Sequence, residues 1–247
     1  MPHHITLTSP LPEDDLRFES MTVSEGLSTL GEMNLTLVSR RSDVKPEDLL
    51  GKIVTVKVEL HEGRKRFFHG HVTRFGMGRP SGRQFGYRAT VRPWLWFLTR
   101  TADCRIFQEM TVPEIVKKVF EDHGVAQFEF NLFRSYRKWN YCVQYRESDF
   151  NFIARLLEHE GIYWYFSHDD SKHKLVLVDS HSAHDAAPQC DSLPYVQSES
   201  ESPGHAEFVT NWVFTREIRT GKVVTTSYDF ERPSTKLKVE QVLQRKY

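Results

Sequence analysis

The residues best suited to chemistry in this sequence are histidines and carboxylates, and the densest group lies near residue 180. It consists of Asp179, His181, His184 and Asp185. Imidazole and carboxylate groups are common metal ligands, but this spacing fixes no coordination geometry. Because the group borders a polar stretch of chain, we interpret it as a solvated loop in preference to a metal site.

His69 and His71 stand two positions apart in a strand-like segment and therefore share one face. Two imidazoles on one face are a possible pair of metal ligands. Gly70 between them favours another interpretation, because a glycine inside a strand permits close approach by a neighbouring element. We therefore expect this strand to pack closely against another part of the chain.

The carboxylates are not arranged for acid–base catalysis. Glu158 and Glu160 lie two apart on an expected helix and point in different directions. Glu147 and Asp149 flank the start of that helix, where capping accounts for them. No GxSxG elbow, HExxH helix, P-loop or GxGxxG turn is present. We predict no catalytic, cofactor-binding or metal-binding residues, and hence no enzyme.

Two further clusters have simple structural interpretations. Trp94, Trp96 and Phe97 have rings that can stack on a sugar or a base. They follow Pro93 at the expected junction between the barrel and the first helix. We therefore interpret them as residues of core packing and domain docking. The basic run Arg64–Arg66 is interpreted as a solvated hairpin tip, since phosphate binding needs a wider basic face.

Charge and cysteine usage narrow the function classes. The 247 residues carry 33 Lys+Arg and 33 Asp+Glu, so no net field attracts nucleic acid or an anionic membrane. The longest apolar runs, such as Ile162–Phe166, are too short to cross a membrane, which argues against stable membrane insertion. The start of the chain has no signal-peptide pattern. The three widely spaced cysteines suggest reduced thiols in a cytoplasmic protein.

The first hundred residues, which must position several of these side chains, are predicted to form β-strands. Short segments with alternating apolar residues predict strands over residues 16–23, 33–38, 53–60, 67–75 and 87–91. The clearest is the 53–60 segment, where Val54, Val56, Val58 and Leu60 point one way. Short strands at this spacing predict a small barrel or sandwich.

Two helices follow with well-marked ends. Thr111 and Glu114 form a capping box, and Gly124 is expected as the left-handed stop of the first helix. The second helix is capped by Ser148 or Asp149 and ends at Gly161. Strands are then expected over residues 162–166 and 174–179, joined by a turn.

The last quarter of the chain is less regular. Residues from Asp185 to His205 are polar and predict a surface loop or linker. Strands are expected again over residues 206–218 and 222–230. The tail from Thr235 to Tyr247 stops without a terminal cap, as in a chain cut inside a longer protein or one with a frayed end.

Four ordered motifs then resemble one known family. The stretch from Cys142 to Phe166, CVQYRESDFNFIARLLEHEGIYWYF, closely resembles a segment of the VgrG family. Trp94–Leu98, then Arg105–Gln108 with Thr111–Ile115, and finally Tyr228–Ser234 match further family segments in the same order. The resemblance runs from about Phe18 to Pro233.

This resemblance implies a fold that is mainly β with helical insertions (α+β), built on two related small β-barrels of the phage baseplate hub type. The implied organisation is a first hub barrel over residues 1–98 and a helix-containing insertion with a second-barrel segment over residues 99–185. A linker over residues 186–205 and returning strands with a truncated hub tail over residues 206–247 complete it.

The resemblance also implies a mechanical function: the hub of a trimeric cell-puncturing spike that caps the secretion tube and helps deliver effectors. The implied partners are two further copies, the Hcp tube hexamer, effector or adaptor proteins, and a PAAR tip protein through parts absent from this chain. No cofactor and no nucleic acid is expected. The protein would be cytoplasmic before firing and then secreted without a signal peptide.

Three alternatives remain open from the sequence. One is the hub of a phage or prophage tail, which the residues alone do not separate from a secretion spike. Another is a module that binds or hydrolyses cell wall, supported by the Trp residues and the histidine loop. The third is a platform for an effector or adaptor that uses the linker from Asp185 to His205.

Overall fold

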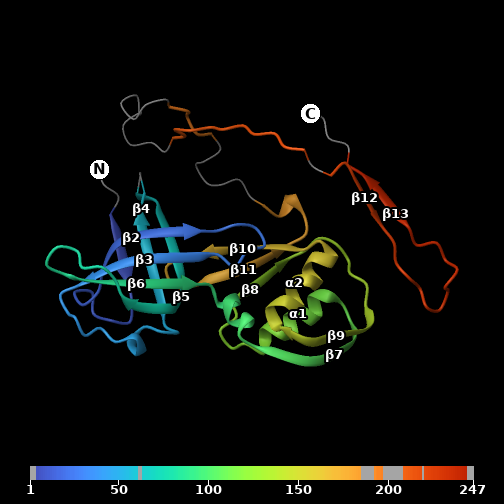
Figure 1. Ribbon diagram of the computed structural model, residues 1–247, viewed down its shortest axis with the longest axis horizontal. Coiled ribbons are helices and arrows are strands. Elements are labelled where there is room, and N and C mark those ends of the chain that lie inside the picture. Colours follow the sequence, from blue (N-terminus) through green and yellow to red (C-terminus); the bar gives the residue numbers. More distant parts are fainter. Residues whose placement is uncertain (1–3, 61–62, 185–191, 197–207, 219, 244–247) are drawn as a thin grey trace. The chain divides into compact units, whose positions relative to one another are not determined.

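Alternating apolar residues in the first ninety positions form one curled antiparallel sheet (Figure 1). The computed structural model describes residues 4–60, 63–184, 192–196, 208–218 and 220–243. The chain divides into two units, Met1–Ser192 and Leu193–Tyr247. The mainly β fold with helical insertions is confirmed, whereas the finer domain boundaries given above stay a prediction.

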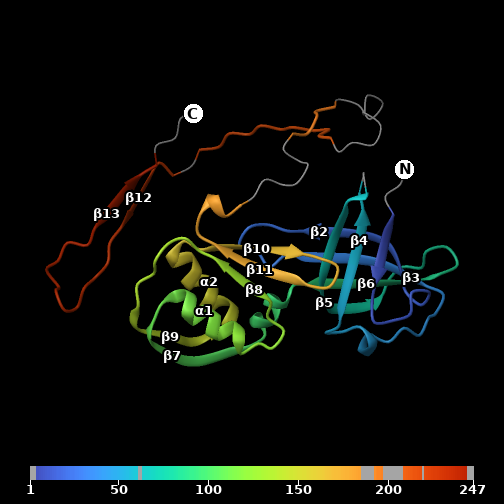
Figure 2. The ribbon, with the colours of Figure 1, turned by 180° about the vertical axis from the view of Figure 1, so that it is seen from behind.

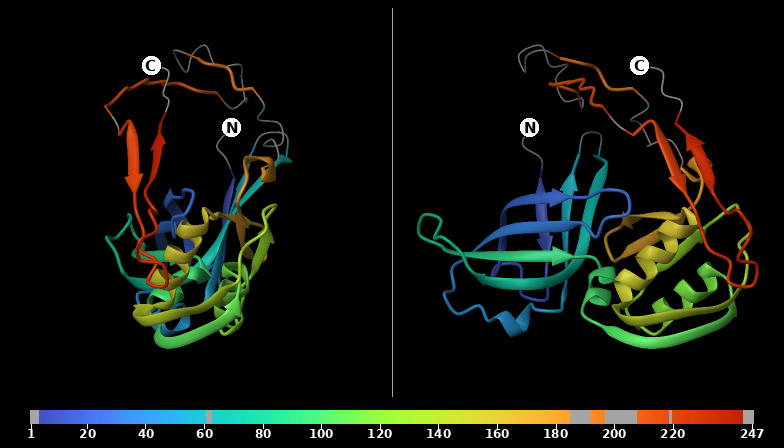
Figure 3. Two further views of the ribbon diagram at one scale, coloured as in Figure 1. Left: turned by 90° about the vertical axis from the view of Figure 1, so that its right-hand side faces the viewer. Right: turned by 45° about the vertical axis from the view of Figure 1, so that its right-hand side comes forward.

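The first sheet has six strands in the order β1-β4-β5-β6-β3-β2. Figure 3 shows how this sheet curls. A core of aliphatic and aromatic side chains packs within the curl and includes Leu35, Val56, Phe68 and Val91. The chain enters the next part through a short 3-10 helix, η3, at Trp94–Thr99. The bounds of the strands are β1 Ile5–Thr8, β2 Arg17–Ser24, β3 Glu32–Ser39, β4 Ile53–Glu59, β5 Lys65–Met77 and β6 Phe85–Arg92.

The remainder of the first unit is a βα arrangement around a second core. Helices α1 and α2 bury their apolar faces together with residues of two small sheets (Figures 1 and 2). One sheet is the antiparallel ribbon β7–β9, and the other has the order β10-β11-β8, with β8 parallel to β11. The bounds are β7 Ala102–Met110, α1 Val112–Glu121, β8 Phe128–Asn131, β9 Trp139–Ser148, α2 Asp149–Glu160, β10 Tyr163–His168 and β11 His173–Val178.

The helix ends follow the sequence signals with one exception. Thr111 and Glu114 form the predicted capping box, Ser148 caps α2, and Gly161 closes α2 with a left-handed φ of 68°. The role predicted for Gly124 is wrong. Helix α1 ends at Glu121, Asp122 is its right-handed cap, and Gly124 lies beyond it without a positive φ. The turn closes through right-handed residues, so no left-handed residue is needed there.

The second unit contains an antiparallel pair, β12 Lys222–Thr225 and β13 Val239–Val242. The strand predicted over residues 206–218 is wrong across its described part, residues 208–218. There only Val209 pairs, in an isolated bridge to Tyr195. The apolar residues that suggested a strand, including Trp212 and Phe214, are exposed, and a strand needs a pairing partner. The later strand is shorter than the predicted 222–230.

Three other features of the fold bear on function. None of the described helices combines the length and apolar character needed to span a membrane. Cys104 and Cys142 are free thiols, while Cys190 lies outside the described residues. Burial raises the pKa of the Cys142 thiol, which keeps it protonated and unreactive at neutral pH.

Replacing Thr111 by Ala tests the capping box. The Thr111 hydroxyl accepts from the Glu114 amide, and the Glu114 carboxylate accepts from the Thr111 amide at 2.7 Å. We expect Thr111→Ala to lower the free energy of unfolding by about 1 kcal/mol, measured by urea denaturation. Thr111→Ser keeps the hydroxyl and should behave as the wild type. Equal losses in the two variants would show that the cap contributes nothing.

Candidate functional site

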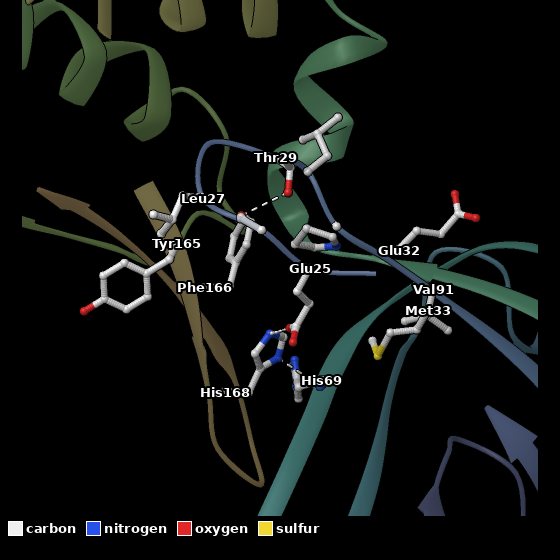
Figure 4. Close-up of a pocket in the computed structure, with 14 residues that line it drawn as sticks. Glu25, Leu27, Thr29, Glu32, Met33, His69, Val91, Tyr165, Phe166 and His168 are labelled. Atoms are coloured by element: carbon white, nitrogen blue, oxygen red, sulfur yellow. Dashed lines mark hydrogen bonds and ion pairs between the residues drawn. The ribbon is translucent and has the colours of Figure 1, made fainter. Parts of the chain in front are cut away.

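A pocket of about 290 Å³ opens where the β2–β3 loop meets β10 (Figure 4). Its wall is largely apolar and includes Leu30, Met33 and Phe166, and one end carries Glu25, His168 and His69. The loop is held in place by a hydrogen bond from the Ser28 amide to the Trp164 carbonyl at 2.9 Å. An apolar cavity with a few convergent polar groups is the usual form of a ligand-binding site.

Glu25 and His168 point toward one another at the polar end of the pocket (Figure 4). His168 Nε2 lies 3.2 Å from the Glu25 carboxylate, which Arg66 also approaches at 3.4 Å. The hydrogen bond from His168 lowers the pKa of Glu25, because it favours the charged carboxylate. His168 Nδ1 accepts the backbone amide of His69 at 3.1 Å. Both ring nitrogens are therefore occupied, and His168 has no lone pair available to act as a general base.

Behind the pocket, β5 packs against the β10–β11 hairpin (Figure 2). Four histidine rings meet at this contact. His69 and His71 come from β5, and His168 and His173 from the hairpin. His69 Nδ1 lies 2.8 Å from His173 Nδ1, and the ring centroids of His71 and His173 are 5.8 Å apart. These four histidines form what we call the histidine junction. It joins the six-stranded sheet to the second core.

The sequence placed His69 and His71 on one face, and the structure confirms close packing as the reason. His71 Nδ1 contacts the Gly51 carbonyl at 3.2 Å, so the two rings use their nitrogens separately. Gly70 faces the core of the sheet, where an added Cβ would meet Val91 Cγ1 at 2.8 Å. Among the described residues, no group of three or more His, Cys, Asp and Glu side chains is placed to hold a metal ion.

The second sequence cluster, near residue 180, is dispersed by the fold. Asp179 is buried and accepts the amides of Phe133 and Arg134 at 3.0 and 2.9 Å. Burial acts to raise the pKa of Asp179, but these hydrogen bonds outweigh it and lower the pKa to about 2. His184 instead contacts the Tyr163 hydroxyl at 2.8 Å.

The two remaining members of that cluster do not join Asp179 either. His181 is exposed in the short 3-10 helix η4, His181–Ala183, and Asp185 lies outside the described residues. The residues near position 180 thus form a loop with its own hydrogen bonds. Asp179 in addition binds the backbone at Phe133 and Arg134.

The sequence offered Ser148 or Asp149 as the cap of the second helix, and Asp149 has a different role in the structure. Ser148 is the helix cap, and the Asp149 carboxylate turns inward. It accepts from Arg105 and Thr101 at 2.7 Å each and from Gln144 at 2.8 Å, and His123 lies at 3.3 Å. Burial acts to raise its pKa, but these partners outweigh it, so the pKa of Asp149 is lowered. This buried network ties β7, β9 and the segment that follows α1 to the start of α2.

The other candidate residues have structural roles. Trp94 is fully buried in the second core, and its indole nitrogen donates to the Gln127 carbonyl at 3.1 Å. Trp96 is half-buried between the guanidinium groups of Arg92 and Arg100. The core-packing interpretation of this aromatic cluster is therefore confirmed.

Among the charged candidates, Glu147 pairs with Arg155 at 2.7 Å, and the basic run lies at the exposed start of β5. No described side chain of the pocket or the histidine junction forms a nucleophile–base pair. What these groups do in the folded chain is to join segments: they hold the β2–β3 loop, β5 and the β10–β11 hairpin together.

The curled β-sheet followed by a βα insertion is a fold that is also found in a solved structure. The E. coli c3393 protein, described as a component of the type VI secretion system with structural similarity to the T4 bacteriophage tail proteins gp27 and gp5, has this fold. It superposes with a TM-score of 0.61 at 21% identity, covering 93% of this chain and 54% of that chain. The chain belongs to the phage tail baseplate hub (GPD) family, whose pattern matches residues 24–246.

Curated relatives specify the branch of this family. The chain is 42% identical over 243 residues to the type VI secretion system spike protein VgrG1b of Pseudomonas aeruginosa, covering 98% of this chain and 33% of that protein. It is 44% identical over 237 residues to VgrG1c of the same organism, covering 95% and 32%. The resemblance to the VgrG family is thus confirmed. The chain spans about a third of the length of these relatives.

Proposed function

We propose that this chain is the hub portion of the trimeric, cell-puncturing spike of a type VI secretion system. The observation that carries the proposal is the identity of 42–44% to spike proteins across nearly the whole chain. In this role three copies cap a tube of Hcp hexamers and help to deliver effector proteins. Two related barrels per chain, times three, would present an approximately sixfold ring to the hexameric tube.

Exposed apolar residues of this chain support a role in assembly. The ribbon β7–β9 packs its inner face on the helices through Phe107 and Cys142. Its outer face carries Ile106, Tyr141 and Tyr145, each more than 60% exposed. Contiguous exposed apolar side chains of this kind mark surfaces that other protein chains cover. We propose that this outer face is covered in the assembled spike.

A chimaera tests both the function and the surface. The matching N-terminal third of VgrG1b is replaced by this chain in a strain that lacks VgrG1b, and spike protein is measured in the culture supernatant. We expect secretion of the chimaera, and a loss of about tenfold when Ile106→Asp and Tyr141→Asp are combined. Met77→Asp is the matched control, because Met77 and Ile106 are both 68% exposed and Met77 lies on the other sheet.

Purified protein separates the possible outcomes. Sedimentation should detect self-association, and a pull-down should detect binding to Hcp rings, both weakened by the double variant with its melting temperature unchanged. A strict monomer with no Hcp binding, together with a chimaera that is not secreted, would refute the proposal. An effect of Met77→Asp equal to that of the double variant would refute only the assignment of the surface.

The same proposal covers the remaining partners and the location. Effector or adaptor proteins and a PAAR tip protein would bind through parts of the full-length spike. The protein would be cytoplasmic before firing and afterwards secreted without a signal peptide. Nucleic acid binding and stable membrane insertion have no part in it. A hub of a phage or prophage tail is the nearest alternative, and neighbouring genes for a sheath ATPase or for a capsid distinguish the two.

We infer further that the chain itself is not an enzyme. The family is one of structural hub and spike proteins. The histidines of the pocket and of the histidine junction form hydrogen bonds within the chain. A peptidoglycan hydrolysis assay tests this. Activity that His181→Ala or Glu160→Ala removes would support the cell-wall alternative and contradict the inference.

A further inference from the structure

The histidine junction contains a chain of hydrogen bonds whose direction is set by two backbone amides. The Trp94 amide lies 2.8 Å from His173 Nε2, and the His69 amide lies 3.1 Å from His168 Nδ1. A backbone amide can only donate a hydrogen bond. His173 Nε2 and His168 Nδ1 must therefore both be unprotonated acceptors.

The protons of the remaining ring nitrogens follow from this. A neutral His173 carries its proton on Nδ1 and donates it to His69 Nδ1 at 2.8 Å. His69 then holds its own proton on Nε2. His168 holds its proton on Nε2, facing the Glu25 carboxylate at 3.2 Å. His168 and His173 thus have both ring nitrogens hydrogen-bonded in the neutral form, whereas the buried Nε2 of His69 has no hydrogen-bond partner.

A second proton on any of these rings removes a contact of the junction. On His173 it displaces the Trp94 amide, and on His168 it displaces the His69 amide. On His69 it sets two N–H groups against each other across 2.8 Å. His69 and His173 are both 3% exposed, so water cannot replace the lost partner without opening the junction.

We propose that the histidine junction is an acid-sensitive latch between the six-stranded sheet and the β10–β11 hairpin, closed at neutral pH and opened by protonation in mildly acidic solution. The latch goes beyond the role of the chain in a spike and does not depend on it. Its opening would release the hairpin, η3 and the β2–β3 loop from β5 while leaving each sheet intact.

The charged groups around the latch do not reverse this. Glu25 faces His168 and is also paired with Arg66, and Asp169 in the hairpin turn is the other carboxylate near His69. His71 lies beside both His69 and His173 on the β5 side. Burial, reinforced by neighbouring histidines, lowers the pKa of His69 to about 4 and that of His173 to about 2.

The sign of the pH effect follows from these pKa values. An imidazole in the open or unfolded chain has a pKa near 6.5, above the values in the closed junction. As pH falls below about 6.5, the open state binds protons first, and the closed state loses stability until about pH 4 for His69 and about pH 2 for His173. Between pH 6.5 and 5.5 this shifts the equilibrium toward opening by about fivefold for one histidine and about thirtyfold for two.

Hydrogen exchange at single amides tests the latch in the wild-type chain. We expect the protection factors of the Trp94 and His69 amides to fall at least about fivefold between pH 6.5 and 5.5. The Leu35 amide, in the β3–β6 ladder, should change less than threefold. Nitrogen NMR of the rings should find His173 protonated on Nδ1 at pH 7.5. Finding His173 protonated on Nε2, or unchanged protection of both junction amides, would overturn the proposal.

A variant gives a second and independent readout. His173→Gln keeps a side-chain acceptor but has no titratable group, so the fall in protection of the Trp94 amide between pH 6.5 and 5.5 should shrink by about fivefold. His181→Gln is the control, because His181 is exposed and outside the junction. A pH dependence identical in His173→Gln and the wild type would contradict the latch. If His173→Gln does not fold, the NMR measurement on the wild type decides the question.

Discussion

Asp149→Ala is expected to lower the free energy of unfolding by roughly 3–5 kcal/mol, which is a large part of the stability of an ordinary domain. The substitution leaves the Arg105 guanidinium, whose side chain is 20% exposed, without its buried counter-ion. It also removes the acceptor of the Thr101 hydroxyl and one of the two acceptors of the Gln144 side-chain amide, the other being the Glu147 carbonyl. Buried donors that lose their acceptor are costly because water does not reach them.

The measurement is urea denaturation of the first unit followed by tryptophan fluorescence at pH 7. Asp122→Asn is the matched control, since Asp122 also pairs with Arg105, at 2.9 Å, but its side chain is 57% exposed. We expect a cost of less than about 1 kcal/mol for that variant. Comparable losses for Asp149→Ala and Asp122→Asn would show that the buried network adds nothing beyond an ordinary surface ion pair.

The pH dependence of this network differs from that of the histidine junction. The pKa of Asp149 is lowered, so its contribution is complete at neutral pH and is lost only as pH falls below the usual aspartate value of about 3.9. The histidine contribution is already declining below about pH 6.5. Acid destabilisation between pH 6.5 and 4 should therefore persist in Asp149→Ala if that variant folds.

Gly70→Ala is expected to be the second most damaging change, with a loss of about 2–3 kcal/mol. The new Cβ would lie 2.8 Å from Val91 Cγ1 and 2.9 Å from the Arg92 carbonyl oxygen. The carbonyl belongs to the backbone of the paired strand β6, so the conflict is relieved only by moving the sheet. That movement would also displace His69 and His71, the two neighbours of Gly70 in the histidine junction.

A second glycine in the same strand provides the control. An added Cβ on Gly76 meets no heavy atom within 4 Å, and Gly76 has no positive φ. Gly76→Ala should therefore be neutral or slightly stabilising in thermal denaturation. If both variants lose the same stability, the loss comes from strand propensity and the close approach at Gly70 has no special weight.

Much of the local structure follows from the sequence because short-range chemistry specifies it. The alternation of Val54 and Val56 with polar residues indicates a half-buried strand, and β4 begins at Ile53 as predicted. The capping box at Thr111 and the left-handed Gly161 mark helix ends through groups only a few residues apart. The ordered VgrG-like motifs predicted the correct family for the same reason, because they specify these strands and helix ends in order along the chain.

The candidate site depended on contacts that no local pattern contains. His69 and His173 are 104 residues apart in the chain, and Asp149 receives Arg105 from 44 residues away. The type of residue was visible at each position, but which residues share a buried space was not. Asp149 therefore looked like a cap, because its position at a helix start satisfies that rule equally well.

The mainly β class, the two helices and the glycine that lets β5 pack closely can all be predicted from the sequence alone. Only the folded structure shows that two histidines of β5 meet two of the β10–β11 hairpin. It also shows that Asp179 and His184 bind different partners. The physical reason is burial. A solvated imidazole or carboxylate has no fixed partner, whereas one enclosed by two packed sheets must find its hydrogen bonds among whatever residues the fold brings within reach.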